Sequence, residues 1–387
     1  MFDYIAYAKA LRHELHQVPE LGFDLPKTIG IVRRELDAWG IPYTVDEFGP
    51  ASIIATINPG KAFTIGLRAD MDALPLQELS NNPFPSQHEG IMHACGHDIH
   101  TSALLAAGRQ LWDMQDQLRC TVKLLFTPAE EHVTPGCKEL ADRGIMDDID
   151  CAVAFHVHPG EAAGKVIILD NGYNANSMGI LCEFFGKSAH AHSQQKGVDA
   201  IRMCVESWMG IEVMAAREIP SKDCFVLNVG KIGGGNTNNI ICDYCSMFLS
   251  ARSWDDPLID FMSRRITEIC EGTAKMIGGT AKVTIKKLLP YVDNHPVMNN
   301  KVRAEAEKLV GKENIVEGVR SMGGEDFAFL TRKKPCSMFR IGVSNDENPD
   351  TKSPLHNSHF DADERCFDTA IPMFVGFVLS NQDGIDF

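Results

Sequence analysis

The chain has 387 residues, which is longer than one hydrophobic core normally supports, so we expect two domains. Its 52 acidic and 37 basic residues give a net charge of −15, which argues against nucleic acid or an anionic membrane as a partner. No apolar run approaches the roughly 20 residues that span a bilayer, and residues 1–16 read as a charged helix rather than a secretory leader. Twelve cysteines in this context predict a reducing, cytoplasmic location.

In chain order, the first half predicts strands that alternate with helices. Apolar periodicity indicates helices at 3–17, 26–39 and 99–114, the second opening at Pro26 and closing at Gly40. Short apolar runs indicate strands at 52–57, 63–67, 121–126 and 151–155. This alternation is typical of a mostly parallel sheet covered by helices.

Three of these strands are followed directly by acidic residues or histidines. The residues that follow the strands are Asp70 and Asp72, Glu130 and Glu131, and His156 and His158, in chain order. Open α/β sheets form their sites at the carboxyl edge of the strands. We therefore expect these side chains to converge at one edge of the sheet.

The pattern changes after residue 180. Strands at 180–185, 225–232, 240–251 and 281–288 and helices at 198–217 and 257–277 follow the order β-α-β-β-α-β, the ferredoxin-like arrangement. The helix–strand pattern then returns, with a helix at 299–309, a strand at 337–343 and a helix at 363–380. We predict an α/β catalytic domain, residues 1–172 and 289–387, interrupted by an inserted α+β ferredoxin-like domain, residues 173–288.

The segment 92–100 combines three imidazoles, one thiol and one carboxylate. Imidazole and thiolate are preferred ligands of zinc-like divalent ions, and Cys95 and His97 offer two donors from one turn. The alternative is a polar loop that happens to be rich in histidine. Further candidate ligands are Glu131, His156 and His356. Five ligands are too many for one tetrahedral ion, so they suit two ions that share a water molecule.

Glu130 and Glu131 are neighbours at a predicted strand end, where consecutive side chains diverge. One carboxylate can then bind metal while the other takes a proton from activated water, as a metallohydrolase requires. On its own, a Glu-Glu pair is more often a solvated acidic loop. The preceding apolar strand and the nearby Cys95 and His97 favour the functional interpretation.

Seven segments, in this order along nearly the whole chain, resemble the aminoacylase/carboxypeptidase type of co-catalytic metallohydrolase. The fit is best to its cysteine-bearing branch of hippurate hydrolases, N-acyl-amino-acid amidohydrolases and auxin-conjugate hydrolases. The segments are RADMDALP (68–75), MHACGHD (92–98), TPAEE (127–131), FHV (155–157), GKSAH (186–190), MGGEDF (322–327) and LHN (355–357).

The resemblance implies two divalent ions, Zn or else Mn, Co or Ni, with Cys95 bridging them. Their ligands would be Cys95, His97, Glu131, His156 and His356. Glu130 would be the general base for a water shared by the ions, and it would then protonate the leaving amine. Residues that orient the ligands would be Asp70, Asp72, His100 and Glu325.

The resemblance also assigns roles to the inserted domain. Similar enzymes dimerise through it, and His190 would reach the partner's active site to polarise the scissile carbonyl. Asn239 and Arg252 would bind the substrate's carboxylate. The chain departs from the family pattern at Cys242, where proline is usual, which puts the contact by Asn239 in doubt.

The implied function is hydrolysis of N-acyl or N-aroyl amino acids to a carboxylate and a free amino acid. One alternative is a dipeptidase or aminopeptidase with the same metal site, against which the anion-binding Arg252 argues. A second is a non-catalytic metal-binding homologue, against which the presence of Glu130 argues. A third is a thiol-redox role for Cys95.

Overall fold

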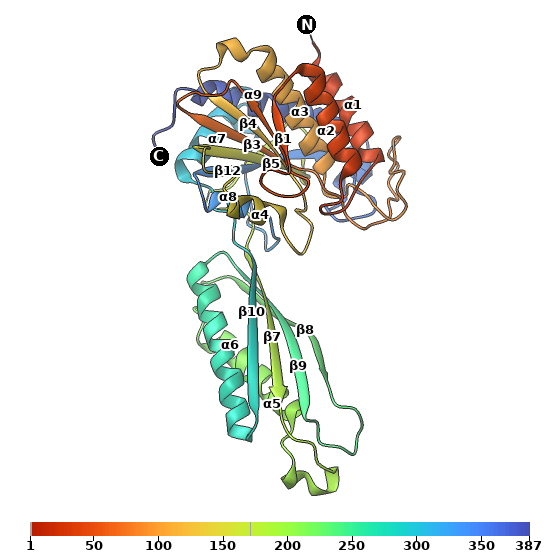
Figure 1. Cartoon of the computed structure of the whole chain (residues 1–387), viewed down its shortest axis with the longest axis vertical. Helices are drawn as coiled ribbons and strands as arrows, with labels where there is room; N and C mark the ends of the chain where they lie inside the picture. The colour runs from red at the N-terminus through yellow and green to blue at the C-terminus, as the bar shows by residue number, and fades with distance from the viewer. Residues whose placement is uncertain (1, 171) are drawn as a thin grey trace. The chain divides into compact units, whose positions relative to one another are not determined.

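A computed structural model describes residues 2–170 and 172–387 of the chain (Figure 1). By their contacts these residues form two compact units. The first comprises Met1–Tyr173, Val292–Arg320 and Asp326–Phe387, and the second comprises Asn174–Tyr291 and Ser321–Glu325. The short segment Ser321–Glu325 therefore groups with the second unit, although the sequence predicted it as part of the catalytic domain.

The first unit contains an eight-stranded sheet with the order β1-β2-β4-β3-β5-β12-β6-β11. Its centre is parallel, because β4, β3, β5 and β12 pair with one another in the same direction. The strands on either side, β2 and β6, pair antiparallel to this centre. The strands are β1 (Tyr43–Val45), β2 (Ile53–Ile57), β3 (Thr64–Asp70), β4 (Thr121–Thr127), β5 (Cys151–Ala162), β6 (Val166–Ile168), β11 (Ile315–Glu317) and β12 (Cys336–Ser344).

Helices cover both faces of this sheet, as Figure 1 shows. One face carries α1 (Tyr4–Gln17), α2 (Pro26–Trp39), α3 (His97–Asp113), α7 (Pro296–Val310) and α9 (Phe367–Asn381). The other face carries α4 (Gly136–Asp142) and α8 (Ala328–Thr331). Short 3₁₀ turns lie at Gln115–Gln117, Lys312–Asn314, Pro349–Lys352 and Glu364–Cys366. Covered on both sides, β3 is buried along its whole length.

Local chemistry sets the helix ends. The side chain of Asp3 accepts a hydrogen bond from Ala6 N and caps α1. Pro26 begins α2, and Gly40 ends it in the left-handed region at φ 70°.

The second unit is a four-stranded antiparallel sheet with two helices (Figure 1). Its elements are β7 (Asn176–Phe185), the 3₁₀ segment Ala191–Lys196, α5 (Ala200–Arg217), β8 (Phe225–Gly234), β9 (Tyr244–Ser253), α6 (Asp256–Ile277) and β10 (Thr280–Leu289). The strand order β10-β7-β9-β8 is that of a ferredoxin-like fold. The predicted fold class, a mostly parallel α/β unit with an α+β unit inserted, is confirmed.

Several predicted elements differ from those observed: β7 begins at Asn176 rather than at residue 180, and β9 begins at Tyr244 rather than at residue 240. The strand predicted at 151–155 continues to Ala162, because β12 goes on pairing with it as far as Ser344. His156 and His158 therefore lie within β5 rather than after it. The helix predicted from residue 363 begins at Phe367, after a 3₁₀ turn that Asp363 caps.

In the described part of the chain, none of the helices combines the length and apolarity required to cross a membrane.

Candidate metal centre

The turn before α3 presents Cys95 and His97. Gly96 lies between them at φ 79°, a left-handed conformation that favours glycine, and it caps α3. A Cβ atom on Gly96 would lie 2.5 Å from Cγ2 of Val157. Only glycine lets this turn pack against β5, the strand that carries His156.

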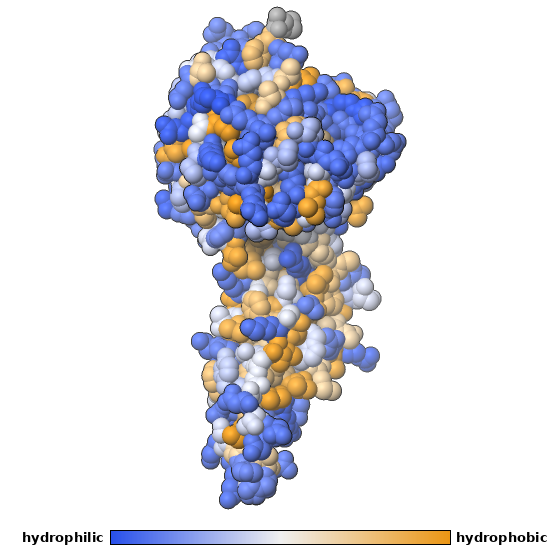
Figure 2. All heavy atoms as spheres, turned by 90° about the vertical axis from the view of Figure 1, so that its right-hand side faces the viewer, coloured by the Kyte–Doolittle hydropathy of each residue, from blue (hydrophilic) through white to orange (hydrophobic). Residues whose placement is uncertain are grey.

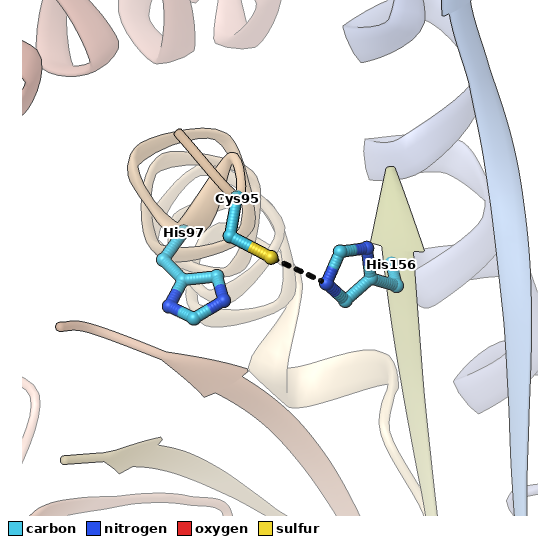
Figure 3. Close-up of side chains that lie close together, drawn as sticks. All are labelled: Cys95, His97 and His156. Atoms are coloured by element: carbon cyan, nitrogen blue, oxygen red, sulfur yellow. Dashed lines mark hydrogen bonds between the residues drawn. The ribbon is translucent and has the colours of Figure 1, made fainter. Parts of the chain in front are cut away.

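The five predicted metal ligands lie close together. The ligand atoms of Cys95, His97 and His156 all lie within 4.8 Å of one another, and so do those of Cys95, Glu131 and His356. In Figure 3 the thiol of Cys95 points at the imidazole of His156, with 3.4 Å between Sγ and Nε2. Nε2 of His356 lies 3.0 Å from Oε1 of Glu131. The two groups share Cys95, the arrangement that a bridging ligand requires.

The donor atoms fit a divalent ion. Nδ1 of His97 donates to the backbone carbonyl of Asp72 at 2.8 Å, which leaves Nε2 to face the other candidate ligands. Nε2 is buried, has no hydrogen-bond partner among the described residues, and lies 3.8 Å from Oδ1 of Asp70. A buried nitrogen without a partner, among a thiol and carboxylates, suits a metal ion.

The electrostatics of the cluster favour a cation. Burial lowers the pKa of His97, but Asp70 and Asp72 outweigh it and raise that pKa to about 10. Burial and the carboxylates of Glu131 and Glu130 raise the pKa of Cys95 well above its usual value. Positive charge is thus stabilised where the ligand atoms meet, and further negative charge is opposed.

Asp72 anchors the loop that carries the two glutamates. Its Oδ1 accepts from Glu130 N at 3.0 Å, and its Oδ2 accepts from Glu131 N at 3.1 Å. Ala129 just before them has φ 59°, in the left-handed region that alanine rarely occupies. This conformation directs two successive N–H groups at one carboxylate. The backbone of this loop is therefore held in place by Asp72.

Asp70 and His100, two of the residues predicted to orient ligands, contact each other next to the candidate ligands. Nδ1 of His100 lies 2.6 Å from Oδ1 of Asp70, and Nε2 of His100 accepts from Val157 N at 3.0 Å. Both side chains are buried. Of these two residues that we predicted to orient ligands, His100 contacts the strand that carries His156, and Asp70 holds His100.

The other predicted site residues lie in the second unit. Glu325 is 2% exposed and belongs to the segment Ser321–Glu325. His190 and Asn239 are neighbours: Ala191 N donates to Asn239 O at 3.0 Å, and His190 forms a bridge to Ile240. Arg252 does not join them, because it pairs with Ser177 near the opposite end of the sheet. Nη1 of Arg252 donates to the carbonyl of Met322 at 2.5 Å.

Sequence reasoning assigned no role to Arg68 and Asp326, which are buried and paired at 2.6 Å behind Asp70. Both lie within motifs that carry the family resemblance. For Arg68, the signal that could have identified it was a charge at the end of an apolar strand; Asp326 lies in a turn before α8 and carries no such signal.

A model of peptidase family M20/M25/M40 matches residues 66–380. The chain belongs to this family. N-acetyl-L-cysteine deacetylase of Bacillus subtilis is 32% identical over 356 residues, covering 92% of this chain and 83% of the relative. Hippurate hydrolase of Campylobacter jejuni is 29% identical and covers 95% of each chain.

Solved structures agree with this membership. A putative aminohydrolase from methicillin-resistant Staphylococcus aureus superposes with a TM-score of 0.89 at 26% identity, covering 99% of this chain and 97% of that one. A dinuclear metal-binding M20 peptidase from Bacillus subtilis gives 0.85 at 25% identity, covering 97% and 98%. The predicted family is confirmed, and this chain is a metal-dependent amidohydrolase that uses divalent metal.

Proposed function

We propose that this enzyme cleaves the amide bond of N-acyl or N-aroyl amino acids and releases a carboxylate and a free amino acid. The observation that carries the proposal is the convergence of five ligand side chains in two groups that share Cys95, with Glu130 next to the ligand Glu131. The relatives named for acyl-amino-acid substrates, the N-acetyl-L-cysteine deacetylase and the hippurate hydrolase, match over almost the whole chain.

We propose two ions per subunit, held by Cys95, His97, Glu131, His156 and His356. Thiolate and imidazole suit zinc, and the carboxylate also admits manganese, cobalt or nickel. When bound, such ions lower the pKa of water and polarise a carbonyl group.

Glu130 is the general base of this proposal. Its backbone N–H is held by Asp72, and its side chain is partly buried next to the ligand Glu131. In this place the carboxylate takes a proton from the attacking water and delivers it to the amine nitrogen that leaves. Asp70, Asp72 and His100 orient the ligands, a role we also propose for Glu325.

We propose that the enzyme is a homodimer formed through the second unit. The strand β8 lies at the edge of the sheet and pairs only with β9 among the described strands. Helix α5 exposes four apolar side chains at intervals of four residues: Ile201, Val205, Met209 and Val213. Figure 2, which looks at the second unit from its β8 side, shows hydrophobic residues gathered on this face. Exposed apolar stripes and open strand edges are normally covered by a partner.

The positions of His190 and Arg252 support a role for His190 in the partner's site. His190 lies beyond the Tyr244 end of β9, and Arg252 lies eight residues farther along that strand (252 − 244). At the usual rise per residue this separates them by roughly 25 Å, too far for one small substrate to contact both. A complete site would take Arg252 from one subunit, and His190 and Asn239 from the other.

All twelve cysteines are free thiols in the structure. Free thiols suit a reducing compartment, so we propose a cytoplasmic location.

Glu130→Gln is the test of the proposed reaction. The metal-loaded variant and the wild type are assayed on N-acetyl, N-benzoyl and N-aminobenzoyl amino acids and on dipeptides. We expect turnover of acyl amino acids by the wild type and a 10²- to 10⁴-fold lower kcat, at unchanged metal content, for the variant. A preference for dipeptides would favour the peptidase alternative, and a fully active variant would overturn the role of Glu130.

Met209→Glu is the test of the interface, with Met276→Glu as its matched control. Met209 on α5 is 62% exposed and Met276 on α6 is 70% exposed. We expect Met209→Glu to produce monomers in sedimentation experiments, because it places charge in the apolar stripe, whereas Met276→Glu stays dimeric. Dimers of normal stability for Met209→Glu would exclude this surface as the interface.

A further inference from the structure

Arg68 lies behind the metal centre, almost fully buried between two carboxylates. Its side chain is 1% exposed, and those of Asp70 and Asp326 are 0% exposed. Nη1 of Arg68 donates to Oδ2 of Asp70 at 2.7 Å, and Nη2 donates to Oδ1 of Asp326 at 2.6 Å. Burying these three charged groups costs hydration free energy, and apolar side chains in their place would avoid that cost. A contribution to stability is therefore a weak explanation for an arginine at this position.

One branch of contacts leads from Arg68 to the strand that carries His156. Asp70, which Arg68 holds by Oδ2, uses Oδ1 to accept from Nδ1 of His100 at 2.6 Å. Nε2 of His100 accepts from the backbone N–H of Val157, the neighbour of His156. Since an amide N–H can only donate, this contact requires His100 to carry its proton on Nδ1. Asp70 thereby fixes both the tautomer and the position of His100 against β5.

A second branch leads to the loop that carries Glu130 and Glu131. Nε of Arg68 donates to Oγ1 of Thr127 at 2.9 Å, at the end of β4 where this loop begins. Oδ2 of Asp326 accepts from Cys137 N at 2.8 Å, where the loop ends in α4. One guanidinium and its partner thus hold both ends of residues 128–136.

We propose that Arg68 is a positioning residue that sets the divalent-metal affinity of the centre. It does so by fixing the loop of Glu131 and the strand of His156 in one relative position. Only a guanidinium has donors in three in-plane directions, which is what simultaneous contacts to Asp70, Asp326 and Thr127 demand. This inference rests on the proposed metal centre and assigns a function to a residue that does not touch the ligands itself.

The test compares Arg68→Lys and Thr127→Val with a control, Tyr173→Phe. Lysine keeps the positive charge but loses the forked donors of the guanidinium. Valine removes the acceptor of Nε, together with the 3.4 Å hydrogen bond that Oγ1 of Thr127 donates to Ala69 O. Tyr173→Phe removes a different buried hydrogen bond, from the hydroxyl to Ile167 O at 2.6 Å, outside the proposed centre. Each protein is stripped of metal. Its dissociation constants for Zn(II) and Co(II) are measured by competition with a chromogenic chelator, its thermal unfolding is recorded, and the Co(II) form is examined for its thiolate absorption band.

We expect Arg68→Lys to bind metal 10- to 100-fold more weakly and to alter the Co(II) band, because a support of the ligand geometry is lost. Thr127→Val should shift both readouts in the same direction by less, and Tyr173→Phe should lower thermal stability alone. Wild-type affinity in Arg68→Lys, or in Thr127→Val if the lysine variant does not fold, would overturn the inference. A wild-type protein that binds neither ion would instead overturn the proposed metal centre, so the two failures are distinguishable.

Discussion

Asp72 connects three groups of the candidate centre. Its carboxylate accepts the backbone N–H groups of Glu130 and Glu131, and its carbonyl accepts from Nδ1 of His97. Asp72 therefore positions the proposed base Glu130 and the candidate ligand Glu131. Through its carbonyl it also determines that the candidate ligand His97 presents Nε2 rather than Nδ1 to a metal ion.

We predict that Asp72→Asn lowers kcat about 10- to 100-fold, with a smaller effect on KM. An amide has one oxygen, so one of the two N–H groups would face an NH₂ group instead of an acceptor. The control is Asp150→Asn, since Oδ2 of Asp150 accepts from Thr64 N at 2.7 Å at the opposite end of β3. Equal kinetic losses in both variants would assign Asp72 a role in folding only.

His16 on α1 lies between Asp98 and Glu78, at 2.8 Å and 3.2 Å. Burial lowers the pKa of His16, but the two carboxylates outweigh it and raise the pKa to about 9. Because the pKa is higher folded than unfolded, protonated His16 stabilises the fold fully below pH of about 6.5. This contribution, roughly 3 kcal/mol, is lost as the pH rises through about 9.

We therefore predict that His16→Gln destabilises the metal-free protein more at pH 6 than at about pH 9.5. Urea unfolding at both pH values measures the difference, and His359→Gln, which removes an exposed imidazole, is the control. A penalty for His16→Gln that does not change with pH would contradict the ion-pair assignment.

The candidate ligands could be predicted from the sequence because each is a single residue of a metal-binding type within a short motif, such as the turn of Cys95 and His97 or the pair Glu130 and Glu131. Contacts that hold those ligands could not. Arg68 and Asp326 are 258 residues apart, and nothing local in the chain indicates that a guanidinium at one position will meet a carboxylate at the other.

At the scale of elements, α3 depends on the glycine that begins it. Gly96 and Gly40 both have positive φ, 79° and 70°, but their surroundings differ. A Cβ on Gly96 would meet Val157, whereas nothing lies within 4 Å of a Cβ on Gly40. Substituting alanine at each of the two glycines therefore separates the cost of backbone strain, which both positions share, from the cost of a clash, which only Gly96 adds.

We predict that Gly40→Ala lowers the free energy of unfolding by about 1 kcal/mol, the strain of a left-handed alanine. Gly96→Ala should cost more and should also weaken metal binding, because the clash moves Cys95 and His97 away from β5. Denaturant unfolding and chelator competition measure the two effects. If both variants behave alike, the packing of Gly96 against Val157 does not control the centre.

Long, strongly patterned elements were predicted well, and α2 has the predicted bounds. Three-residue strands such as β6 and β11 were not predicted, because so few residues carry no periodicity. The extension of β5 beyond residue 155 was missed for another reason: its pairing partner, β12, lies far along the chain.

At the scale of the whole molecule, the order of elements alone sufficed to predict an inserted ferredoxin-like unit. Each unit buries a hydrophobic core of its own, and the apolar periodicity restarts where one core gives way to the other. A homodimer could be predicted only from the family resemblance, because in the sequence an exposed apolar stripe on a helix has the same pattern as one that faces the core.

We predict that His190→Ala and Glu130→Gln, each nearly inactive alone, recover about a quarter of wild-type activity when mixed under conditions that exchange subunits. Half of the dimers would then be mixed, and each would hold one intact site. Wild-type protein mixed with Glu130→Gln is the control for exchange. No recovery in verified heterodimers would place His190 in the site of its own subunit.

The segment Ser321–Glu325 is held by the second unit although both of its flanks belong to the first. Nδ2 of Asn174 donates to Gly324 O, Nε1 of Trp254 donates to Ser321 O, and Arg252 donates to Met322 O. The chain consequently passes between the units four times, at 173/174, 291/292, 320/321 and 325/326. Domain exchange between related enzymes must therefore transplant two pieces of chain together. Deleting 174–291 as a single cassette would strand these five residues directly before Asp326, the carboxylate on which Arg68 depends.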